Sequence, residues 1–417
     1  MDVLVVGTGE YVTGYVHGAA SGSDKGLGVI ALILFDLRRR GKVNRILLCG
    51  QHGDRFPEIR THFKTQIASR YSGLDVTIET FPPDDAYLST AYLTAIQSLG
   101  QNSVVIVVTP DDTHYDIATA AIKAGMHVLV AKPLVKTLEE HQSLLQAARQ
   151  YRVLVSVEMH KRFDPMYADA CARARSYGDF SFMSSYMSQP KNQLKTFKTW
   201  AGRSSDVSYY LNAHHVDWLV WMMQGRGRPV WVSGVSATGV SEAELGIKTE
   251  DTITLTVQWE NLPSGHLGIS IHTASWIAST SDAHSQQRFF LMNQRGELQV
   301  DQARRGYSTA TQDTGYASLN PLFMRYIPLD GKFVGQDCYG YRSIEMFIDA
   351  ALSIDQGYAT FESFDSTLPT VNQTLQTTAI LQAGRLSLDN GNQPAKLHYG
   401  TIESLVPIRL SLAEGIT

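Results

Sequence analysis

Short apolar runs alternate with helix-type segments through the first 158 residues. The apolar runs have the length of buried strands and lie at 2–6, 46–49, 76–81, 104–108, 127–131 and 153–157. Segments with helical periodicity separate most of them, at 29–40, 59–71, 86–99 and 137–151. This alternation is typical of a parallel, doubly wound α/β sheet. We therefore predict a first domain of that class over residues 1–158.

The pattern changes after residue 158. Several later runs alternate apolar and polar positions, as strands with one covered face do, at 180–188, 229–237, 251–260, 265–273, 287–293 and 296–301. Helical segments are expected at 166–177, 213–223, 341–353 and 368–386. We predict a second, α+β domain over residues 159–417 with a large, mostly antiparallel sheet.

Composition narrows the class of protein. The 417 residues are 43% hydrophobic and 18% charged, with a net charge of −4. These values fit a globular protein and argue against a nucleic-acid partner. Three widely spaced cysteines predict neither a disulfide framework nor a zinc site, and Cys49 is expected to be a buried thiol. No apolar run is long enough to span a membrane and no leader pattern precedes the first strand, so we expect a cytoplasmic protein.

The first strand runs into a glycine turn, Gly7-Thr8-Gly9. In a dinucleotide-binding unit the first glycine permits the tight turn and the second lets the backbone approach a pyrophosphate. The third glycine of the usual fingerprint is absent, because Val12 stands there. We interpret residues 10–28 as an enlarged loop over the phosphates; the alternative is a plain strand-to-helix turn.

The end of the second strand bears on the choice of dinucleotide. NAD-binding proteins usually place a carboxylate there for the ribose hydroxyls, but this chain has Gly50. Arg55 follows and could meet a 2′-phosphate, which favours NADP over NAD. A solvated loop charge is the alternative for Arg55.

Two ionisable groups follow the strands at 104–108 and 127–131. His114 comes four residues after Pro110, and Lys132 directly follows the second of these strands. Ligands bind at the carboxyl ends of parallel strands. Lys132 there could donate to a substrate oxygen, with a pKa lowered by partial burial. The alternatives are a solvent-reaching lysine and a helix-capping or surface histidine.

A polar cluster, residues 209–217, opens the predicted helix at 213–223. His214 and Asp217 share a helix face, so the carboxylate could hold one imidazole tautomer. Histidine is the natural general base for a hydroxyl proton near neutral pH. The adjacent His214 and His215 point in different directions, and we predict no metal site.

These motifs together resemble the glucose-fructose oxidoreductase/inositol dehydrogenase (Gfo/Idh/MocA) family. The resemblance is most specific at Thr109-Pro110 with His114, at residues 124–133 (AGMHVLVAKP), at Arg162-Phe163-Asp164-Pro165 and at 210–217. It implies an N-terminal Rossmann domain, a C-terminal domain on a large open sheet, and NAD- or NADP-dependent oxidation or reduction of a hydroxyl-bearing carbon of a sugar, cyclitol or related polyol. It also implies a homodimer or homotetramer.

The resemblance assigns residues to roles. Lys132 corresponds to the family's active-site lysine and His214 to its catalytic histidine, while Tyr210 could donate a further hydrogen bond. The dinucleotide would contact Gly7, Thr8, Gly9, Glu10, Tyr11, Gly50, Arg55, Thr109, Pro110, His114 and Lys132. For the substrate we expect Arg162, Lys198, Asn212 and Tyr341.

The chain departs from the family pattern near the expected chemistry. Ala131 replaces the glutamate that usually precedes the lysine, and Tyr210 stands where the second motif usually has aspartate. These departures leave two other functions open. One is a non-catalytic dinucleotide-binding regulator with the same fold, and the other is an NAD-dependent glycoside hydrolase.

Overall fold

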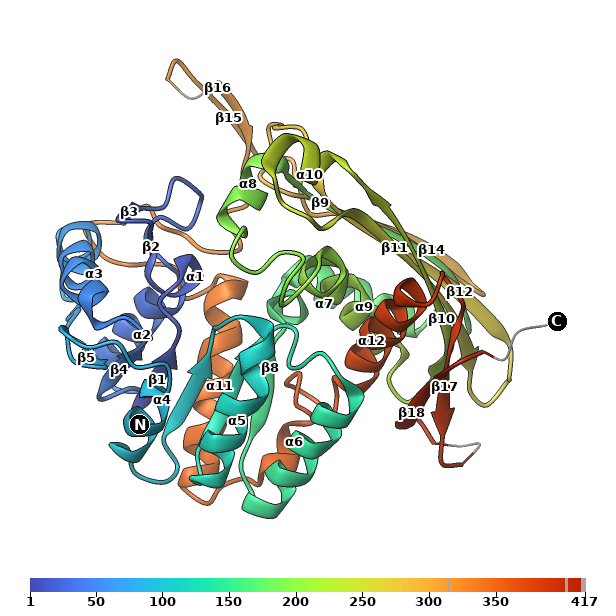
Figure 1. Ribbon diagram of the computed structural model, residues 1–417, viewed down its shortest axis with the longest axis horizontal. Coiled ribbons are helices and arrows are strands. Elements are labelled where there is room, and N and C mark those ends of the chain that lie inside the picture. The colour runs from blue at the N-terminus through green and yellow to red at the C-terminus, as the bar shows by residue number, and fades with distance from the viewer. Residues whose placement is uncertain (314, 402–403, 414–417) are drawn as a thin grey trace. The chain divides into compact units, whose positions relative to one another are not determined.

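The computed structural model describes residues 1–313, 315–401 and 404–413. The chain forms two compact units (Figure 1). Unit 1 comprises Met1–Leu134, Ser143–Asp164 and Pro321–Asn372. Unit 2 comprises Val135–Gln142, Pro165–Asn320 and the described residues from Gln373 onward. The units are therefore not two consecutive stretches divided at residue 158.

Unit 1 is built on the predicted parallel sheet. Its six strands lie in the order β5-β4-β1-β6-β7-β8, and every neighbouring pair is parallel. The strands are β1 (Val3–Val6), β4 (Ile46–Cys49), β5 (Glu79–Phe81), β6 (Val104–Val107), β7 (His127–Ala131) and β8 (Val155–Glu158). All residues of β1, β4, β6 and β8 are buried. This explains why these strands read as continuous apolar runs.

Helices connect these strands as expected, with shifted ends. They are α2 (Ile30–Arg39), α3 (Phe56–His62), α4 (Ala91–Gln97), α5 (His114–Lys123) and α6 (Leu138–Tyr151). The helix predicted at 59–71 continues beyond α3 only as a π-helical turn, Phe63–Ala68. The helix predicted at 86–99 starts later because its first residues pair with the loop after β4. Leu88 donates its amide to the carbonyl of Gln51, and His52 forms a β-bridge with Tyr87.

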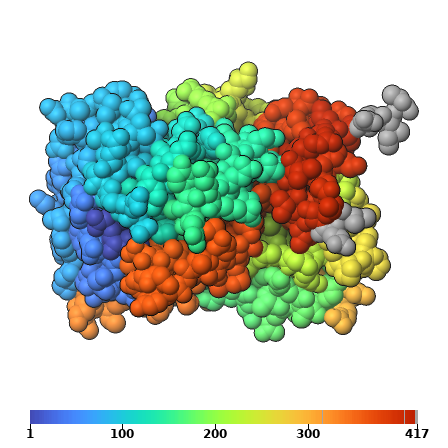
Figure 2. All heavy atoms as spheres, turned by 90° about the horizontal axis from the view of Figure 1, so that it is seen from below, coloured from blue at the N-terminus to red at the C-terminus, as the bar shows by residue number. Residues whose placement is uncertain are grey.

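The segment 321–372 belongs to unit 1, although the sequence analysis placed it in the second domain. Its helix α11 (Tyr339–Asp355) contributes Ile344, Phe347 and Ile348 to the core that also contains β1 and α2. In Figure 2 the orange surface of this segment lies against the blue surface of the N-terminal residues. Residues 369–371 then bond along β8, so the helix predicted at 368–386 begins only at Leu375.

The expected enlarged loop has its own structure. A single helical turn, α1 (Glu10–Thr13), follows the glycine turn, and two short strands, β2 (Tyr15–Val16) and β3 (Ala19–Ala20), form a hairpin. The amide of Val29 donates to the carbonyl of Tyr11. This backbone hydrogen bond joins the two ends of the segment between α1 and α2.

Unit 2 is built on an eight-stranded sheet in the order β14-β13-β9-β12-β11-β10-β17-β18. Its strands are β9 (Phe180–Pro190), β10 (Gly227–Thr238), β11 (Glu250–Asn261), β12 (Leu267–Ala278), β13 (Gln286–Asn293), β14 (Gly296–Asp301), β17 (Ala395–Tyr399) and β18 (Pro407–Leu412). The β9–β12 pair is parallel and the other pairs are antiparallel. This confirms the predicted mostly antiparallel sheet.

Three helices, α7 (Pro165–Arg175), α9 (Ala213–Met223) and α12 (Leu375–Asp389), lie on one face of the unit 2 sheet (Figure 1). Buried and half-buried residues alternate strictly along β11, as expected for a sheet with one covered face. The sequence analysis missed β17, β18, the hairpin strands β15 (Ser308–Thr311) and β16 (Gly315–Ser318), and the short helices α8 (Lys191–Thr196) and α10 (Val240–Leu245). The hairpin is largely exposed and lacks an apolar pattern.

The cysteines and the helix lengths bear on the remaining expectations. Cys49, Cys171 and Cys338 are free and buried, which confirms the buried thiol predicted at Cys49. No helix in the described ranges is long and apolar enough to cross a membrane.

The glycine turn yields a stability prediction. Gly7 has a φ of +122°, and a Cβ there would lie 1.9 Å from the Val108 carbonyl oxygen. Gly9 has a φ of −71°, and a Cβ at that position would have no neighbouring atom within 4 Å. Gly7→Ala should lose at least about 2 kcal/mol of unfolding free energy, whereas Gly9→Ala should stay within about 1 kcal/mol of the parent. Urea denaturation measures both, and equal losses would contradict this account.

Candidate functional site

The carboxyl ends of four adjacent strands define the candidate site of unit 1. β1, β6, β7 and β8 are neighbours in the sheet, and each is followed by a group of chemical interest. Gly7 follows β1, Thr109 lies two residues beyond β6, Lys132 follows β7, and Glu158 ends β8. Because parallel strands end at the same edge, the register brings these positions to one side of the sheet.

The turn after β1 has the form that a dinucleotide pyrophosphate requires. The Gly7 amide donates to the carbonyl of Cys49, and its Cα lies close to the backbone of Val108. Gly9 is exposed, with open space where a side chain would be. A backbone without a Cβ at this place can approach a phosphate closely, so the residues present fit the group. The Glu10 carboxylate accepts hydrogen bonds from the hydroxyls of Ser21 and Ser23 and thereby holds the excursion after α1.

The end of β4 presents no acid at the ribose position. A side chain on Gly50 would begin 2.9 Å from the Thr8 methyl carbon. Two residues on, the His52 ring lies 4.8 Å from the ring of Tyr87, which is 63% exposed. Arg55 is exposed at the end of the following 3-10 turn. This edge therefore offers an aromatic pair and a cation.

Lys132 is half-buried at the end of β7. Burial lowers its pKa to about 8, while the charges of Asp111 and Glu158 oppose that change. Ala131, the residue before it, pairs in register with Glu158 on β8. A lysine in this setting changes protonation close to neutral pH, which suits a group that donates to a substrate oxygen.

Glu158 is the centre of a polar cluster that the sequence analysis missed. One carboxylate oxygen accepts a hydrogen bond from the Ser343 hydroxyl at 3.1 Å, and the other lies 3.1 Å from His160 Nδ1. The His160 ring stacks 5.8 Å from Tyr339. Tyr11 lies in the same surroundings: burial raises its pKa, and the charge of Glu158 raises it further. An acid at the end of a buried strand was the available sequence signal.

His114 ties two strand-end loops together. It is fully buried, with Nδ1 2.9 Å from the Pro133 carbonyl oxygen and Nε2 2.9 Å from the Thr109 carbonyl oxygen. Pro110 precedes the 3-10 turn that leads to this histidine. His114 thus holds the loops after β6 and β7 in place, and it is not a surface group.

In unit 2 a π-helical turn, Ser208–Asn212, carries Tyr210 and leads into α9 with His214 in its first turn. Asp206 fixes the start of this turn. Its Oδ1 accepts hydrogen bonds from the amides of Ser208 at 2.8 Å and Tyr209 at 2.9 Å. Burial raises the pKa of Asp206.

Tyr210 is half-buried in an aromatic group. Its hydroxyl accepts a hydrogen bond from Gln189 Nε2 at 3.2 Å. Its ring lies 4.9 Å from Phe197 and 5.4 Å from Trp200. Lys198, between these two aromatic residues in sequence, is exposed. Aromatic walls with a few polar groups are typical of small-molecule sites, and the sequence analysis missed all of these residues except Tyr210 and Lys198.

The two histidines of α9 differ in their surroundings. His214 is 8% exposed and His215 1% exposed. His215 Nε2 lies 3.0 Å from the Tyr167 hydroxyl, inside the core of unit 2. Asp217, proposed above as a partner of His214, accepts a hydrogen bond from the Thr377 hydroxyl at 3.2 Å.

Two of the expected substrate residues have structural contacts instead. Asn212 is 2% exposed, and its amide nitrogen donates to the Ser208 hydroxyl and the Ile253 carbonyl. Tyr341 is fully buried in unit 1; its hydroxyl donates to Asp36 at 2.6 Å and accepts from Arg40 at 2.8 Å. We correct both expectations, because a buried and hydrogen-bonded group cannot face a substrate. Arg162 is 8% exposed in the turn after β8.

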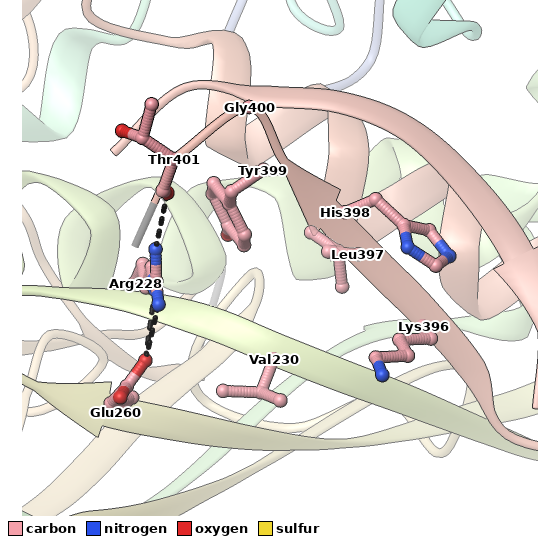
Figure 3. Close-up of a pocket in the computed structure, with 9 residues that line it drawn as sticks. All are labelled: Arg228, Val230, Glu260, Lys396, Leu397, His398, Tyr399, Gly400 and Thr401. Carbon is pink, nitrogen blue, oxygen red and sulfur yellow. Dashed lines mark hydrogen bonds and ion pairs between the residues drawn. The ribbon is translucent and has the colours of Figure 1, made fainter. Parts of the chain in front are cut away.

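A surface pocket of about 330 Å³ lies on unit 2, beside β10 and β17 (Figure 3). Arg228 at its wall pairs with Glu260 at 2.8 Å, and its guanidinium lies over the Tyr399 ring. Its charge is therefore compensated within the unit. The pocket contains none of the residues singled out from the sequence, and no group of three metal-ligating side chains occurs in the described part of the chain.

Burial of Lys132 yields a prediction about stability. Between pH 8 and 10.5 the folded chain has lost a proton that the unfolded chain still binds, so stability at this site rises with pH. Lys132→Met should be more stable than the parent at pH 7, by about 1–3 kcal/mol, with the difference shrinking by pH 10. Denaturant titrations at both pH values measure it, with the exposed Lys123→Met as the control. A destabilised Lys132→Met at pH 7 would contradict the assignment.

The chain is similar to known proteins in the sequence of its first 159 residues and in its fold. Residues 1–159 match the model of the GFO/IDH/MocA oxidoreductase family, described as an NAD-binding Rossmann fold. A curated relative, scyllo-inositol 2-dehydrogenase (NADP(+)) IolW of Bacillus subtilis, is 29% identical over 176 residues, 41% of this chain. The match spans 47% of that protein, so less than half of its length is compared.

Two solved structures share the fold along nearly the whole chain. GenD2 from gentamicin A biosynthesis, in complex with NAD, has a TM-score of 0.67 and 18% identity, covering 96% of this chain and 97% of its own. Myo-inositol 2-dehydrogenase from Lactobacillus plantarum has a TM-score of 0.65 and 15% identity, covering 95% and 99%. The first 159 residues therefore match the GFO/IDH/MocA family model, and the chain as a whole shares its fold with these two structures.

Proposed function

We propose that the protein is an NAD(P)-dependent oxidoreductase acting on a hydroxyl-bearing carbon of a sugar, cyclitol or related polyol. The observation that carries this proposal is the half-buried Lys132 at the same sheet edge as the Gly7–Gly9 turn. The relatives named as inositol dehydrogenases support the class of substrate. The nicotinamide, when bound, supplies or accepts the hydride.

The proposed roles follow from the chemistry of each side chain. Gly7 and Gly9 would hold the pyrophosphate, with Thr109 and Pro110 nearer the nicotinamide. Lys132 would donate a hydrogen bond to the substrate oxygen and stabilise negative charge that develops on it. His214 would accept the hydroxyl proton as general base. These roles of Lys132 and His214 rest on the resemblance as well as on their burial.

Substrate contacts are proposed for the half-buried aromatic group of unit 2. Tyr210 presents a hydroxyl within a wall formed with Phe197 and Trp200. Such a surface combines apolar area with a directed polar group, which suits a ring that bears hydroxyls. The exposed Lys198 and the basic Arg162 would favour a substrate with an acidic or phosphorylated substituent.

We further propose that NADP is the preferred dinucleotide. Gly50 leaves the ribose position without a carboxylate, and the exposed Arg55 lies beyond it on the same loop. A carboxylate there would repel a 2′-phosphate, whereas a guanidinium forms charge-assisted hydrogen bonds with it.

Separate titrations with NADH and NADPH, monitored by nicotinamide fluorescence, measure the binding of each dinucleotide. Arg55→Ala should weaken NADPH binding about tenfold, since a charge-assisted contact is lost, and leave NADH binding within about twofold. Arg149→Ala, an exposed arginine at the end of α6, is the control. No binding of either dinucleotide at millimolar concentration would overturn the proposed function.

With the preferred dinucleotide, a screen of sugars and polyols then tests turnover. Lys132→Ala and His214→Ala should each reduce kcat at least about a thousandfold while dinucleotide binding is largely kept. Full activity of either variant would remove that residue from its role. Tight dinucleotide binding without turnover of any polyol would instead favour the regulator described above.

We also propose self-association through the face of the unit 2 sheet opposite α7, α9 and α12. Neighbouring strands place Met292, Phe182 and Ile269 side by side in register. Met292 is 41% and Ile269 37% exposed. An apolar row on an open sheet face is typical of an interface between copies.

A charge in this row tests the association. Ile269→Lys should lower the mass measured by light scattering to that of a smaller species, because a lysine would be desolvated in the interface. Thr254→Lys, on the same face at a more polar position, is the comparison. A parent protein that is already monomeric at micromolar concentration would refute the proposal.

A further inference from the structure

The strand pair β7–β8 places a carboxylate across from the residue that precedes Lys132. Position 131 carries alanine, where the family resemblance leads one to expect glutamate. The register partner of Ala131 is Glu158, on the adjacent parallel strand. Residues paired in this way have neighbouring side chains at the same sheet edge. Glu158 therefore ends the strand next to the one that Lys132 follows, and its charge acts on Lys132.

We propose that Glu158 is the positioning residue for Lys132. Its carboxylate, at the end of β8, replaces the acid that Ala131 does not provide on β7. This inference rests on the proposed function for the role of Lys132. The electrostatic coupling between the two side chains can be tested independently of that role.

The surroundings of Glu158 hold its carboxylate in a fixed orientation. The side chain is 8% exposed and contacts groups from two other elements. Ser343 of α11 donates to Oε1, and His160 Nδ1 lies against Oε2, both at 3.1 Å. Contacts at both oxygens restrict the rotation of the carboxylate group. Glu158 therefore supplies a negative charge at a defined place.

Lys132 experiences charges from each neighbouring strand end. Asp111 follows β6 and Glu158 ends β8, and both favour the protonated lysine against the effect of burial. Tyr11 of α1, Tyr339 of α11 and His160 are further titratable groups around Glu158. If the Glu158 carboxylate is removed, only Asp111 still opposes the effect of burial. The protonated form of Lys132 then becomes less favourable.

The coupling predicts how Lys132 titrates in variants. In Glu158→Gln the pKa of Lys132 should fall by about one unit, because one of two neighbouring charges is lost. At pH 7 its neutral fraction then rises, and acetylation of Lys132 by an amine-reactive ester should become several-fold faster. In turnover assays the alkaline limb, where Lys132 loses its proton, should move to lower pH by the same amount.

A carboxylate exchange provides the sharpest test. Ala131→Glu combined with Glu158→Gln returns the acid to β7 across the same register pair and should restore the pH midpoint of Lys132 labelling. Ala131→Glu alone should raise that midpoint above the parent's, since a third carboxylate is added. Glu139→Gln, at an exposed position on α6, should leave it unchanged.

Labelling is followed by peptide mass spectrometry on the full chain across pH 6 to 11, with folding checked by circular dichroism. If Glu158→Gln does not fold, Glu158→Asp keeps the charge but withdraws the carboxylate by one methylene group, and a smaller downward shift is expected. An unchanged labelling midpoint in the folded variant would overturn the inference. The labelling needs neither dinucleotide nor substrate, so a shift without any turnover would refute only the proposed function.

Discussion

The hydrogen-bond register of four parallel strands is the constraint on which the unit 1 site depends. β1, β6, β7 and β8 are aligned so that Val6 pairs with Val107, Val107 with Val130, and Ala131 with Glu158. A slip of one residue would turn each following side chain to the other face. The buried apolar strands make such a slip costly, and they thereby fix the groups that follow them.

The loops beyond this edge are held by buried hydrogen bonds and by close backbone packing. His114 bridges the carbonyls after β6 and β7, and the Gly7 turn packs directly on Val108. In unit 2, Asp206 fixes the π-helical turn through two backbone amides. Rigid supports of this kind place reactive side chains within narrow limits. A polar side chain supports the fold when its polar atoms point to the backbone, and it can take part in chemistry when they point to a ligand.

At the edge of the unit 1 sheet, neighbouring charges partly offset the desolvation of Lys132. Lys132 is partly removed from water, and neighbouring carboxylates offset part of that cost. Glu158 is in turn stabilised by hydrogen bonds from α11 and from the turn after β8. Groups with shifted protonation cluster at functional sites because the same burial that costs stability tunes their chemistry. The segment 321–372 is thus part of the site's surroundings as well as of the core.

The local pattern of this chain determined the strands of the parallel sheet, the fold class and the turn at Gly7–Gly9, because buried parallel strands and tight turns leave a periodicity and a glycine requirement in the sequence. It also singled out Lys132 from its place after a buried strand. Only the tertiary structure showed that α11 covers the first sheet and that Tyr341 and Asn212 are buried in structural contacts. It alone paired Glu158 with Ala131, since strand register and helix packing join residues that are distant in sequence and leave no local signal.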